Sequence, residues 1–311
     1  MKAIVFGGSG FLGSHVADAL TDDGHDVVIY DLKISPYLKS GQEMIVGDIL
    51  DCDKVERAVR GCAIVYNFAG IADIHDASQR PLDSVKFNIL GNSVILEACR
   101  KSAIKRFIFA SSLYVYSKAG SFYRSTKQSS ELLIENYHEV FGLKYTILRY
   151  GSLYGPRADS RNFIHNILTQ AVSKGKIIRE GDGEELREYI HVYDAARSSI
   201  AALSEEFINQ HVIITGNQQM KVKDLLAMIR EMMDNKIEIE YTNSDPAYHY
   251  EITPYAFAPK LAKRIVNRTF LDIGQGILES IQSIYREFNP LIVYDNVLVK
   301  EQDTKISGHK K

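Results

Sequence analysis

A tyrosine and a lysine four residues apart, Tyr123 and Lys127, are the side chains in this sequence best suited to acid–base chemistry. On a helix the two lie on one face, about one turn apart. Because an ammonium group favours a nearby phenolate, Lys127 would lower the pKa of Tyr123 and make it a base near neutral pH. A serine hydroxyl sharing the substrate oxygen would complete the set. Both Ser111 and Ser112 follow the apolar strand 106–110, at the edge where open α/β sheets bind ligands.

Three glycines stand between a short apolar strand and a helical pattern. Gly7 permits a tight turn, Gly10 lets backbone amides approach a pyrophosphate, and Gly13 lets the helix pack close to the strand. Asp31 ends the next strand, 18 residues after Gly13, where its carboxylate can bind the ribose hydroxyls of an adenosine. That acid also repels a 2′-phosphate, so NAD is favoured over NADP, a preference that the cation Lys33 would weaken. The alternative is a glycine-rich turn with no ligand.

The elements that must position these groups alternate along the first half of the chain. Apolar runs typical of strands occupy 2–6, 26–30, 43–47, 63–68, 106–110 and 145–149, and amphipathic segments typical of helices occupy 11–23, 53–60, 83–101 and 123–141. Strands separated by helices predict a parallel sheet covered on both faces. The segments 188–192 and 211–215 have the pattern of strands that return to this sheet.

The expected fold class is therefore α/β: a Rossmann-type doubly wound parallel sheet with a smaller, interleaved C-terminal substrate-binding region. The predicted organisation is an NAD-binding domain at 1–150 with returning segments near 188–215, a substrate-binding region at 151–187 and 216–290, and a polar tail at 291–311.

Charge and composition exclude several classes of function. The 37 Lys and Arg residues nearly balance 39 Asp and Glu residues, so neither nucleic acid nor an anionic membrane is an expected partner. The start of the chain is too polar for a signal peptide, and no apolar run could span a bilayer, so a cytoplasmic protein is expected. The odd number of cysteines, with no metal-ligand spacing, predicts buried thiols and no metal site at Cys52, Cys62 or Cys99.

Further motifs follow the three glycines in a fixed order. They are YNFAG (66–70), KFNILGNSVILEAC (86–99), SSLYVY (111–116), YRSTK (123–127), LRYGSLYGPR (148–157) and GDGEELREYIHVYDAA (181–196). The ordered set resembles the extended short-chain dehydrogenase/reductase superfamily, in particular its NAD-dependent nucleotide-sugar epimerase/dehydratase branch of the UDP-glucose 4-epimerase type. The resemblance covers about residues 1–285.

The resemblance implies a role for each matching residue. Ser112 becomes the catalytic hydroxyl, Tyr123 the general acid/base, and Lys127 the residue that holds the nicotinamide ribose. NAD is the implied cofactor and a nucleotide sugar the implied substrate, with Ser112, Ser152 and Arg187 as substrate-binding candidates; Arg187 would meet a nucleotide phosphate. The cofactor-binding candidates are Gly7, Gly10, Phe11, Leu12, Gly13, Asp31, Asp48, Ile49, Phe68, Ala69, Gly70, Asn88, Tyr123, Lys127 and Tyr150. For Asp48, capping the next helix is the alternative to facing the adenine.

Three features depart from the family pattern. Only the six residues 117–122 separate Tyr116 from Tyr123, where relatives carry a longer, proline-containing loop, so the rim of the sugar site is expected to be open or closed by another segment. Ser152 stands where relatives have an asparagine that contacts a substrate phosphate. No Arg-x-Gly-Asp pattern, which often clamps the second phosphate, occurs near 249–260.

The residues after the catalytic serine separate the expected reactions. Dehydratases of this branch carry an Asp-Glu pair there and decarboxylases a glutamate, whereas this chain has Leu113 and Tyr114. The leading hypothesis is therefore epimerisation at C4 through a transient ketosugar, with hydride transfer to and from bound NAD. The alternative is an NAD(P)-dependent ketoreductase or dehydrogenase. A 4,6-dehydratase and a non-catalytic dinucleotide-binding protein are less favoured, and His191 is expected to be structural.

A homodimer is expected from two helical segments. The segments 83–101 and 123–141 carry more apolar residues than one face against a sheet needs, and in relatives such a pair forms a two-fold four-helix interface. The apolar residues concerned are Val94, Ile95, Leu96, Leu132, Leu133, Ile134 and Tyr137.

Overall fold

A parallel sheet of eight strands organises the chain. The computed structural model describes residues 1–102, 104–242, 263–264 and 271–288. The sheet has the order β13-β10-β6-β5-β4-β1-β2-β3, and each neighbouring pair is parallel. Its strands are β1 (Lys2–Phe6), β2 (Asp26–Asp31), β3 (Gln42–Val46), β4 (Ile64–Asn67), β5 (Arg106–Ser112), β6 (Tyr145–Tyr150), β10 (Gln210–Ile214) and β13 (Lys263–Arg264). The predicted Rossmann-type sheet is confirmed.

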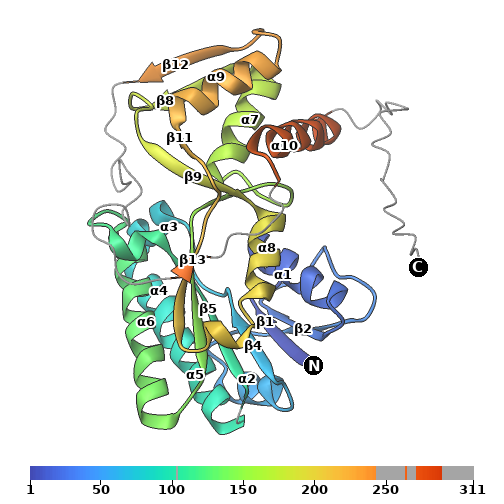
Figure 1. The fold of residues 1–311 in the computed structure, drawn as a ribbon, viewed down its shortest axis with the longest axis vertical. Helices are drawn as coiled ribbons and strands as arrows, with labels where there is room; N and C mark the ends of the chain where they lie inside the picture. The colour runs from blue at the N-terminus through green and yellow to red at the C-terminus, as the bar shows by residue number, and fades with distance from the viewer. Residues whose placement is uncertain (103, 243–262, 265–270, 289–311) are drawn as a thin grey trace, which may run out of the picture.

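Helices cover both faces of this sheet (Figure 1). The helices α1 (Phe11–Asp22) and α8 (Val192–Ala201) lie on one face, and α2 (Cys52–Val59), α5 (Gly91–Ser102) and α6 (Ser121–Phe141) lie on the other. Side chains of one strand alternate between the two cores: Ala3 and Val5 pack with α1, whereas Ile4 and Phe6 pack with α2 and α5. Burial on both faces explains why the strands are continuously apolar.

Two smaller sheets and three helices form a second body beyond one edge of the large sheet (Figure 1). The first small sheet has the order β11-β9-β7, and in the second β12 pairs with β8. The elements are β7 (Ser152–Tyr154), α7 (Phe163–Lys174), β8 (Lys176–Glu180), β9 (Leu186–His191), β11 (Gln219–Lys221), α9 (Val222–Met232), β12 (Glu238–Thr242) and α10 (Ile273–Phe288). Their core includes Ile167, Leu168, Leu225, Ile229 and Ile277.

The two segments expected to return to the large sheet behave differently. Residues 211–215 do so, since β10 pairs with β6. Residues 188–192 instead supply most of β9, which lies between β7 and β11 in the small sheet. The predicted tail 291–311 and the segment 249–260 lie outside the described residues.

The helix expected at 83–101 is interrupted by a wider turn. It consists of α4 (Pro81–Ser84), the π-helical turn η1 (Val85–Leu90) and α5, and it follows α3 (Ile74–Gln79). The described residues also form two short 3-10 helices, η2 (Leu113–Tyr116) and η3 (Glu205–Phe207). The wide turn contains Asn88, whose buried side chain donates a hydrogen bond to the carbonyl oxygen of Ile71 rather than facing solvent. Such turns recur at functional sites.

Most of the apolar residues behind the dimer expectation belong to the core. Ile95, Leu96 and Ile134 are fully buried. Val94, Leu133 and Tyr137 pack against the same cluster, and among these residues only Leu132 is largely exposed, at 61%. Residues that the sequence suggested for a dimer interface therefore mainly hold α5 and α6 to the sheet.

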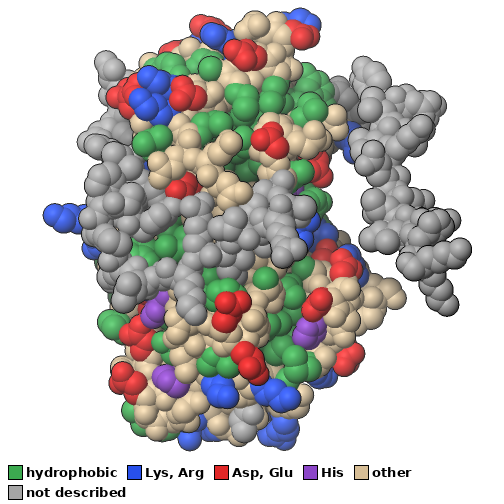
Figure 2. All heavy atoms as spheres, in the orientation of Figure 1, with side chains coloured by type: hydrophobic (Ala, Val, Ile, Leu, Met, Phe, Trp, Pro, Cys, Tyr) green, Lys and Arg blue, Asp and Glu red, His purple; other side chains and the backbone are tan. Residues whose placement is uncertain are grey.

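The surface carries charges of both signs, and the cysteines differ in burial. Positive and negative side chains are interspersed on the face shown in Figure 2. Within the described ranges, no helix has the length and apolar character needed to cross a membrane, and no three His, Cys, Asp or Glu side chains are grouped to hold a metal. Cys62 and Cys99 are buried as predicted, but the prediction is wrong for Cys52, which is exposed at the start of α2.

Candidate active site

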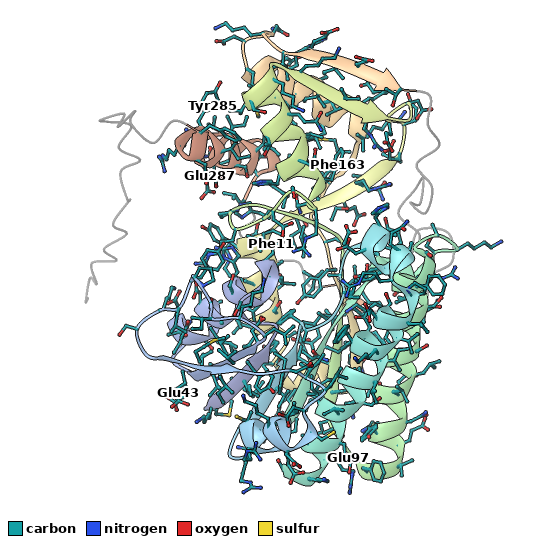
Figure 3. The ribbon with its side chains drawn as sticks, turned by 180° about the vertical axis from the view of Figure 1, so that it is seen from behind. Phe11, Glu43, Glu97, Phe163, Tyr285 and Glu287 are labelled. Carbon is teal, nitrogen blue, oxygen red and sulfur yellow. The ribbon has the colours of Figure 1, made fainter. Side chains whose placement is uncertain are left out.

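The carboxyl ends of parallel strands meet at one edge of the sheet, and the predicted cofactor residues follow several of these ends. Strand β1 leads into the glycine turn, and α1 begins at Phe11 after Gly10, with no side chain capping its first turn. Figure 3 places Phe11 between the large sheet and the second body. The uncapped amides of a helix N-terminus are suited to an anion such as a pyrophosphate.

The glycine turn leaves no room for side chains. A Cβ atom on Gly13 would lie 2.2 Å from the carbonyl oxygen of Gly7. The first helical turn of α1 therefore packs directly against the backbone of the glycine turn. Gly7 has φ of +75°, and a Cβ there would lie 2.7 Å from the amide nitrogen of Ala69 at the end of β4. This close backbone packing keeps the turn narrow, as a dinucleotide pyrophosphate requires.

Asp31 lies against the glycine turn, as the sequence predicts for a ribose-binding acid. Its Oδ2 atom accepts a hydrogen bond from the backbone amide of Ser9 at 3.0 Å. The hydroxyl of Ser9 in turn donates to the carbonyl oxygen of Lys33. The end of β2 is thereby joined to the turn, and its carboxylate lies beside the glycines.

The loop after β3 contains Asp48 and Ile49. The Oδ1 atom of Asp48 accepts a hydrogen bond from the amide of Leu50 at 2.9 Å. The capping alternative for Asp48 is wrong, because the side chain that caps α2 is that of Asp51. Ile49 packs against α5, where a Cβ on Gly91 would lie 2.4 Å from its Cδ1 atom.

Asn88 shapes the loop at the end of β4. Its amide nitrogen donates to the carbonyl oxygen of Ile71 and to the hydroxyl of Thr126, both at 3.0 Å, and its Oδ1 atom accepts from the amide of Ile71 at 2.7 Å. Gly70 has φ of +138° and passes so close to Asn88 that a Cβ would lie 2.4 Å from Oδ1. Asn88 thus joins the loop 68–71 to α6, directly before Lys127.

The side chain of Tyr150 does not lie at the carboxyl edge of the large sheet. The ring is buried among the side chains that face α1 and α8. Its hydroxyl lies 2.6 Å from the hydroxyl of Ser199 on α8. The sequence therefore predicted a cofactor contact for a side chain that the structure places in the core.

The catalytic candidates come from the end of β5 and the start of α6. Ser112 ends β5, and its hydroxyl accepts a hydrogen bond from the amide of Tyr114 at 3.3 Å. Tyr123 and Lys127 lie on successive turns of α6, and the Lys127 Nζ atom is 5.7 Å from the centre of the Tyr123 ring. The same Nζ donates to the carbonyl oxygen of Ala110 at 2.7 Å. The predicted one-turn spacing of phenol and ammonium is present.

Burial gives Lys127 an unusual proton affinity. Its ammonium is fully enclosed, and this loss of hydration lowers the pKa of Lys127 to about 8, while the charge of Glu131 acts in the opposite direction. The group is therefore a cation at neutral pH but loses its proton in mildly alkaline solution.

The connection between Tyr116 and α6 is even shorter than the sequence suggests. Gly120, with φ of +97°, already caps α6, and the guanidinium of Arg124 donates to the carbonyl oxygens of Ser117 and Lys118. The ring of Tyr114 meets that of Tyr123 edge-on, with 6.2 Å between the ring centres. An aromatic ring, in addition to the short loop, therefore borders the general acid/base candidate.

The two other substrate candidates lie in the small sheet. Ser152 is on β7, paired in register with Tyr189 of β9, and Arg187 precedes Tyr189 by two residues on that strand. Arg187 is buried, and its guanidinium donates to the carbonyl oxygen of Leu186 at 2.9 Å. The pair therefore comes from neighbouring strands beyond the carboxyl edge of the large sheet.

His191 has the environment of a structural residue. Its Nδ1 atom accepts a hydrogen bond from the amide of Tyr193 and so caps α8. The imidazole packs edge-on against the rings of Tyr154 and Tyr193. Burial lowers the pKa of His191 to about 4, so it is neutral at physiological pH.

Two buried charges next to the site were not identified from the sequence. Glu131 of α6 and Arg149 of β6 form an ion pair of 2.6 Å, with side chains only 6% and 4% exposed. One signal was available: Glu131 follows Lys127 by one helical turn, and Arg149 interrupts the apolar run 145–150.

Comparisons with known proteins give a consistent result. A model of the NAD dependent epimerase/dehydratase family matches residues 3–215. A putative UDP-glucose 4-epimerase of Methanocaldococcus jannaschii is 28% identical over 295 residues, covering 88% of this chain and 95% of that protein. A UDP-N-acetyl-alpha-D-glucosaminuronate decarboxylase of Bacillus cytotoxicus is 27% identical over 275 residues, covering 79% and 85%.

Solved structures of two nucleotide-sugar epimerases have a similar fold. The structure of UDP-glucose 4-epimerase from Thermotoga maritima with UDP-glucose has a TM-score of 0.79 and 25% identity, covering 93% of this chain and 99% of that one. The UDP-glucuronic acid 4-epimerase of Bacillus cereus, solved with UDP-glucuronic acid and NAD, has the same TM-score at 24% identity, covering 92% and 100%, and supports the fold.

Proposed function

Because the chain belongs to the NAD-dependent epimerase/dehydratase family, we propose that it epimerises a nucleotide-activated sugar at C4 through a transient ketosugar. The cofactor is NAD, as the glycine turn and Asp31 indicate and as the family implies. The predicted resemblance is thereby confirmed at the level of the family, and the choice of reaction and substrate is the proposal.

The residues that fit the cofactor are those at the carboxyl edge of the large sheet. The glycine turn would hold the pyrophosphate, Asp31 the adenosine ribose, and Lys127 the nicotinamide ribose. Ala69 and Gly70 would line the cofactor with their backbone, because they lie against Gly7 and Asn88. When bound, NAD supplies the acceptor and donor of one hydride.

The protein's own residues would handle the proton. Tyr123 as phenolate takes the proton of the sugar 4-hydroxyl while the hydrogen on C4 leaves as hydride, and a carbonyl forms. The cationic Lys127 on the next turn stabilises the phenolate, and the Ser112 hydroxyl donates a hydrogen bond to the same sugar oxygen. In the reverse step Tyr123 returns the proton after the hydride has been returned to the other face of C4.

The observation that carries the choice of epimerisation is the nature of the residues after Ser112. Leu113 is buried, 1% exposed, and Tyr114 presents its ring to Tyr123. Neither offers the carboxylate that elimination or decarboxylation would use at this place. Reversible hydride and proton transfer needs only the groups that are present, provided that the ketosugar can turn.

We assign the nucleotide sugar to the space between the large sheet and the second body. Arg187 would bind a phosphate, and the Ser152 hydroxyl would make a neutral contact beside it. The division into an NAD-binding domain at 1–150 and a substrate-binding region at 151–187 and 216–290 is part of this proposal. UDP is the favoured nucleotide, because the relatives named above act on UDP-sugars.

A panel of nucleotide sugars tests the reaction. Purified protein with NAD is incubated with UDP-glucose, UDP-N-acetylglucosamine or UDP-glucuronic acid, and the anomeric proton signals are followed by NMR. We expect one of them to be converted to its C4 epimer with no net change in NADH absorbance. Stoichiometric NADH consumption would favour a ketoreductase, and release of carbon dioxide or loss of the sugar 6-hydroxyl would contradict epimerisation.

A homodimer through α5 and α6 remains a proposal. Its support is the exposure of Leu132, Val140 and Phe141 on α6, at 61%, 70% and 52%. We expect light scattering to give twice the monomer mass at micromolar concentration, and Leu132→Glu to give the monomer mass because it would bury a charge. A monomeric wild-type protein would reject the proposal.

A further inference from the structure

A buried polar network lies directly behind the candidate catalytic residues. Glu131, one turn after Lys127, accepts hydrogen bonds from the Ser111 hydroxyl at 2.6 Å and from the Arg149 Nε and Nη2 atoms at 3.0 and 2.6 Å. The Arg149 Nη1 atom donates to the Tyr116 hydroxyl at 2.7 Å. The carboxylate is thus surrounded by donors on two sides and shielded from water.

Stability alone does not explain such a pair. Removing two charges from water costs several kcal/mol per ion, and buried ion pairs can often be replaced by apolar side chains without loss of stability. Glu131 and Arg149 make their contacts at the point where β5, β6 and α6 meet, next to the residues proposed to act on the sugar. Their position therefore points to a role in the site.

The network fixes the end of β5 against α6. Two consecutive strand residues are bonded to two helix residues one turn apart: Lys127 donates to the carbonyl oxygen of Ala110, and Ser111 donates to Glu131. Ser111 is also in register with Arg149 on the neighbouring strand. The next residue is Ser112, so the distance between its hydroxyl and α6 depends on these contacts.

The charges around Lys127 are few. Its Nζ atom faces the neutral carbonyl of Ala110 and the rings of Phe109 and Tyr123, with 4.8 and 5.7 Å to the ring centres. Glu131 is the charged group that raises the pKa of Lys127 against the effect of burial.

Two further titratable groups, Arg149 and His211, contact Glu131. Arg149 binds both carboxylate oxygens, and the Nε2 atom of His211 on β10 lies 3.9 Å from one of them. The same His211 nitrogen is closer to Glu135, at 3.0 Å. Arg149 is thus the closer cationic partner of the Glu131 carboxylate.

We propose that Glu131 is a positioning residue of this site: its carboxylate, paired with Arg149, favours the cationic form of Lys127 one helical turn away and fixes Ser111, and thereby Ser112, against α6. The inference rests on the proposed function only in giving Lys127 and Ser112 a part in the reaction. The charge state of Lys127 can be measured without any turnover.

The test compares Glu131→Gln with Glu135→Gln in the NAD-loaded full chain. Lysine labelled with 13C at the ε carbon is followed by NMR against pH, and the Lys127 signal is assigned by its loss in Lys127→Met. In Glu131→Gln we expect the Lys127 titration to move to lower pH by about one unit, the lower end of the effect of an opposite charge one helical turn away. In Glu135→Gln, one turn further along α6, we expect no movement.

Activity gives a second reading. With UDP-glucose as the probe, the alkaline limb of the kcat profile is expected to move with the Lys127 titration in Glu131→Gln. A purely structural role would lower kcat at all pH values and leave the limb in place. If no nucleotide sugar is turned over while the Lys127 titration still moves, the proposed function fails, but the effect of Glu131 on the charge of Lys127 is supported.

A double variant guards against misfolding. Glu131→Gln leaves Arg149 without its carboxylate partner, whereas Glu131→Gln with Arg149→Gln removes both charges of the pair, and we expect the same direction of shift for Lys127. A Lys127 titration that matches the wild type in the folded variants overturns the proposal. Loss of folding in both variants would also overturn it, because the pair would then be a requirement of the fold.

Discussion

Replacing Gly13 by alanine tests the glycine turn most severely. The new Cβ would lie 2.2 Å from the carbonyl oxygen and 2.9 Å from the carbonyl carbon of Gly7. Both are backbone atoms that cannot rotate away, so α1 would have to move outward by roughly 1 Å to reach van der Waals contact. The movement would loosen Val16, Ala17 and Leu20, which are fully buried against the sheet.

The expected cost follows from this geometry. Overpacking of a tight interior typically costs about 1–3 kcal/mol, and the better helix propensity of alanine returns about 1 kcal/mol. We expect Gly13→Ala to lose up to about 2 kcal/mol of unfolding free energy in urea. We also expect NAD to stabilise it far less than the wild type, which gains about 2.7 kcal/mol at a hundredfold excess over Kd.

Gly91→Ala is the matched control. Its Cβ would come as close, 2.4 Å, but to the end of the Ile49 side chain, which can change rotamer. We expect this variant to stay within about 1 kcal/mol of the wild type. Because Ile49 is itself a cofactor candidate, the response of Gly13→Ala to NAD is compared with that of the wild type. If Gly13→Ala matched Gly91→Ala in stability and the wild type in its stabilisation by NAD, the argument that close backbone packing shapes the cofactor turn would be refuted.

Two further predictions concern buried polar groups. Asn88→Ala should lose about 2–4 kcal/mol in urea unfolding, because the amide and carbonyl of Ile71 lose their partner; an unchanged midpoint would contradict the role given to the π-helical turn. His191 binds a proton more weakly in the folded state than in the unfolded chain, so stability should fall as pH drops from about 6.5 to about 4. This histidine alone accounts for about 2–3 kcal/mol between pH 7 and pH 4.5, and His191→Gln, compared at both pH values, should show a smaller loss than the wild type.

Local spacing predicted much of the site. The glycine turn, the acid that ends β2, and the Tyr123–Lys127 pair are set by residues close in sequence, so their geometry follows from one turn or one strand end. The other contacts depend on which face of the sheet each strand side chain occupies. Arg149 and Tyr150 are adjacent on β6 and therefore face opposite sides of the sheet, which puts Tyr150 beside Ser199 and Arg149 beside Glu131.

Long-range pairing could not be derived from the sequence in the same way. The segment that became β9 has a strand pattern, but nothing local shows that it pairs with β7 and β11 rather than with the large sheet. The π-helical turn likewise depends on Asn88 meeting Ile71 and Thr126, residues 17 and 38 positions away. Such contacts are settled by packing and not by periodicity.

The fate of the hydrogen on C4 tests the central claim most directly. UDP-glucose carrying deuterium at C4 is incubated with the NAD-loaded protein in ordinary water, with Tyr123→Phe as the comparison. The account predicts that UDP-galactose forms with the deuterium still on C4, and that Tyr123→Phe retains NAD but forms the product at least about a hundredfold more slowly. Loss of the deuterium to water, or undiminished turnover by Tyr123→Phe, would contradict it.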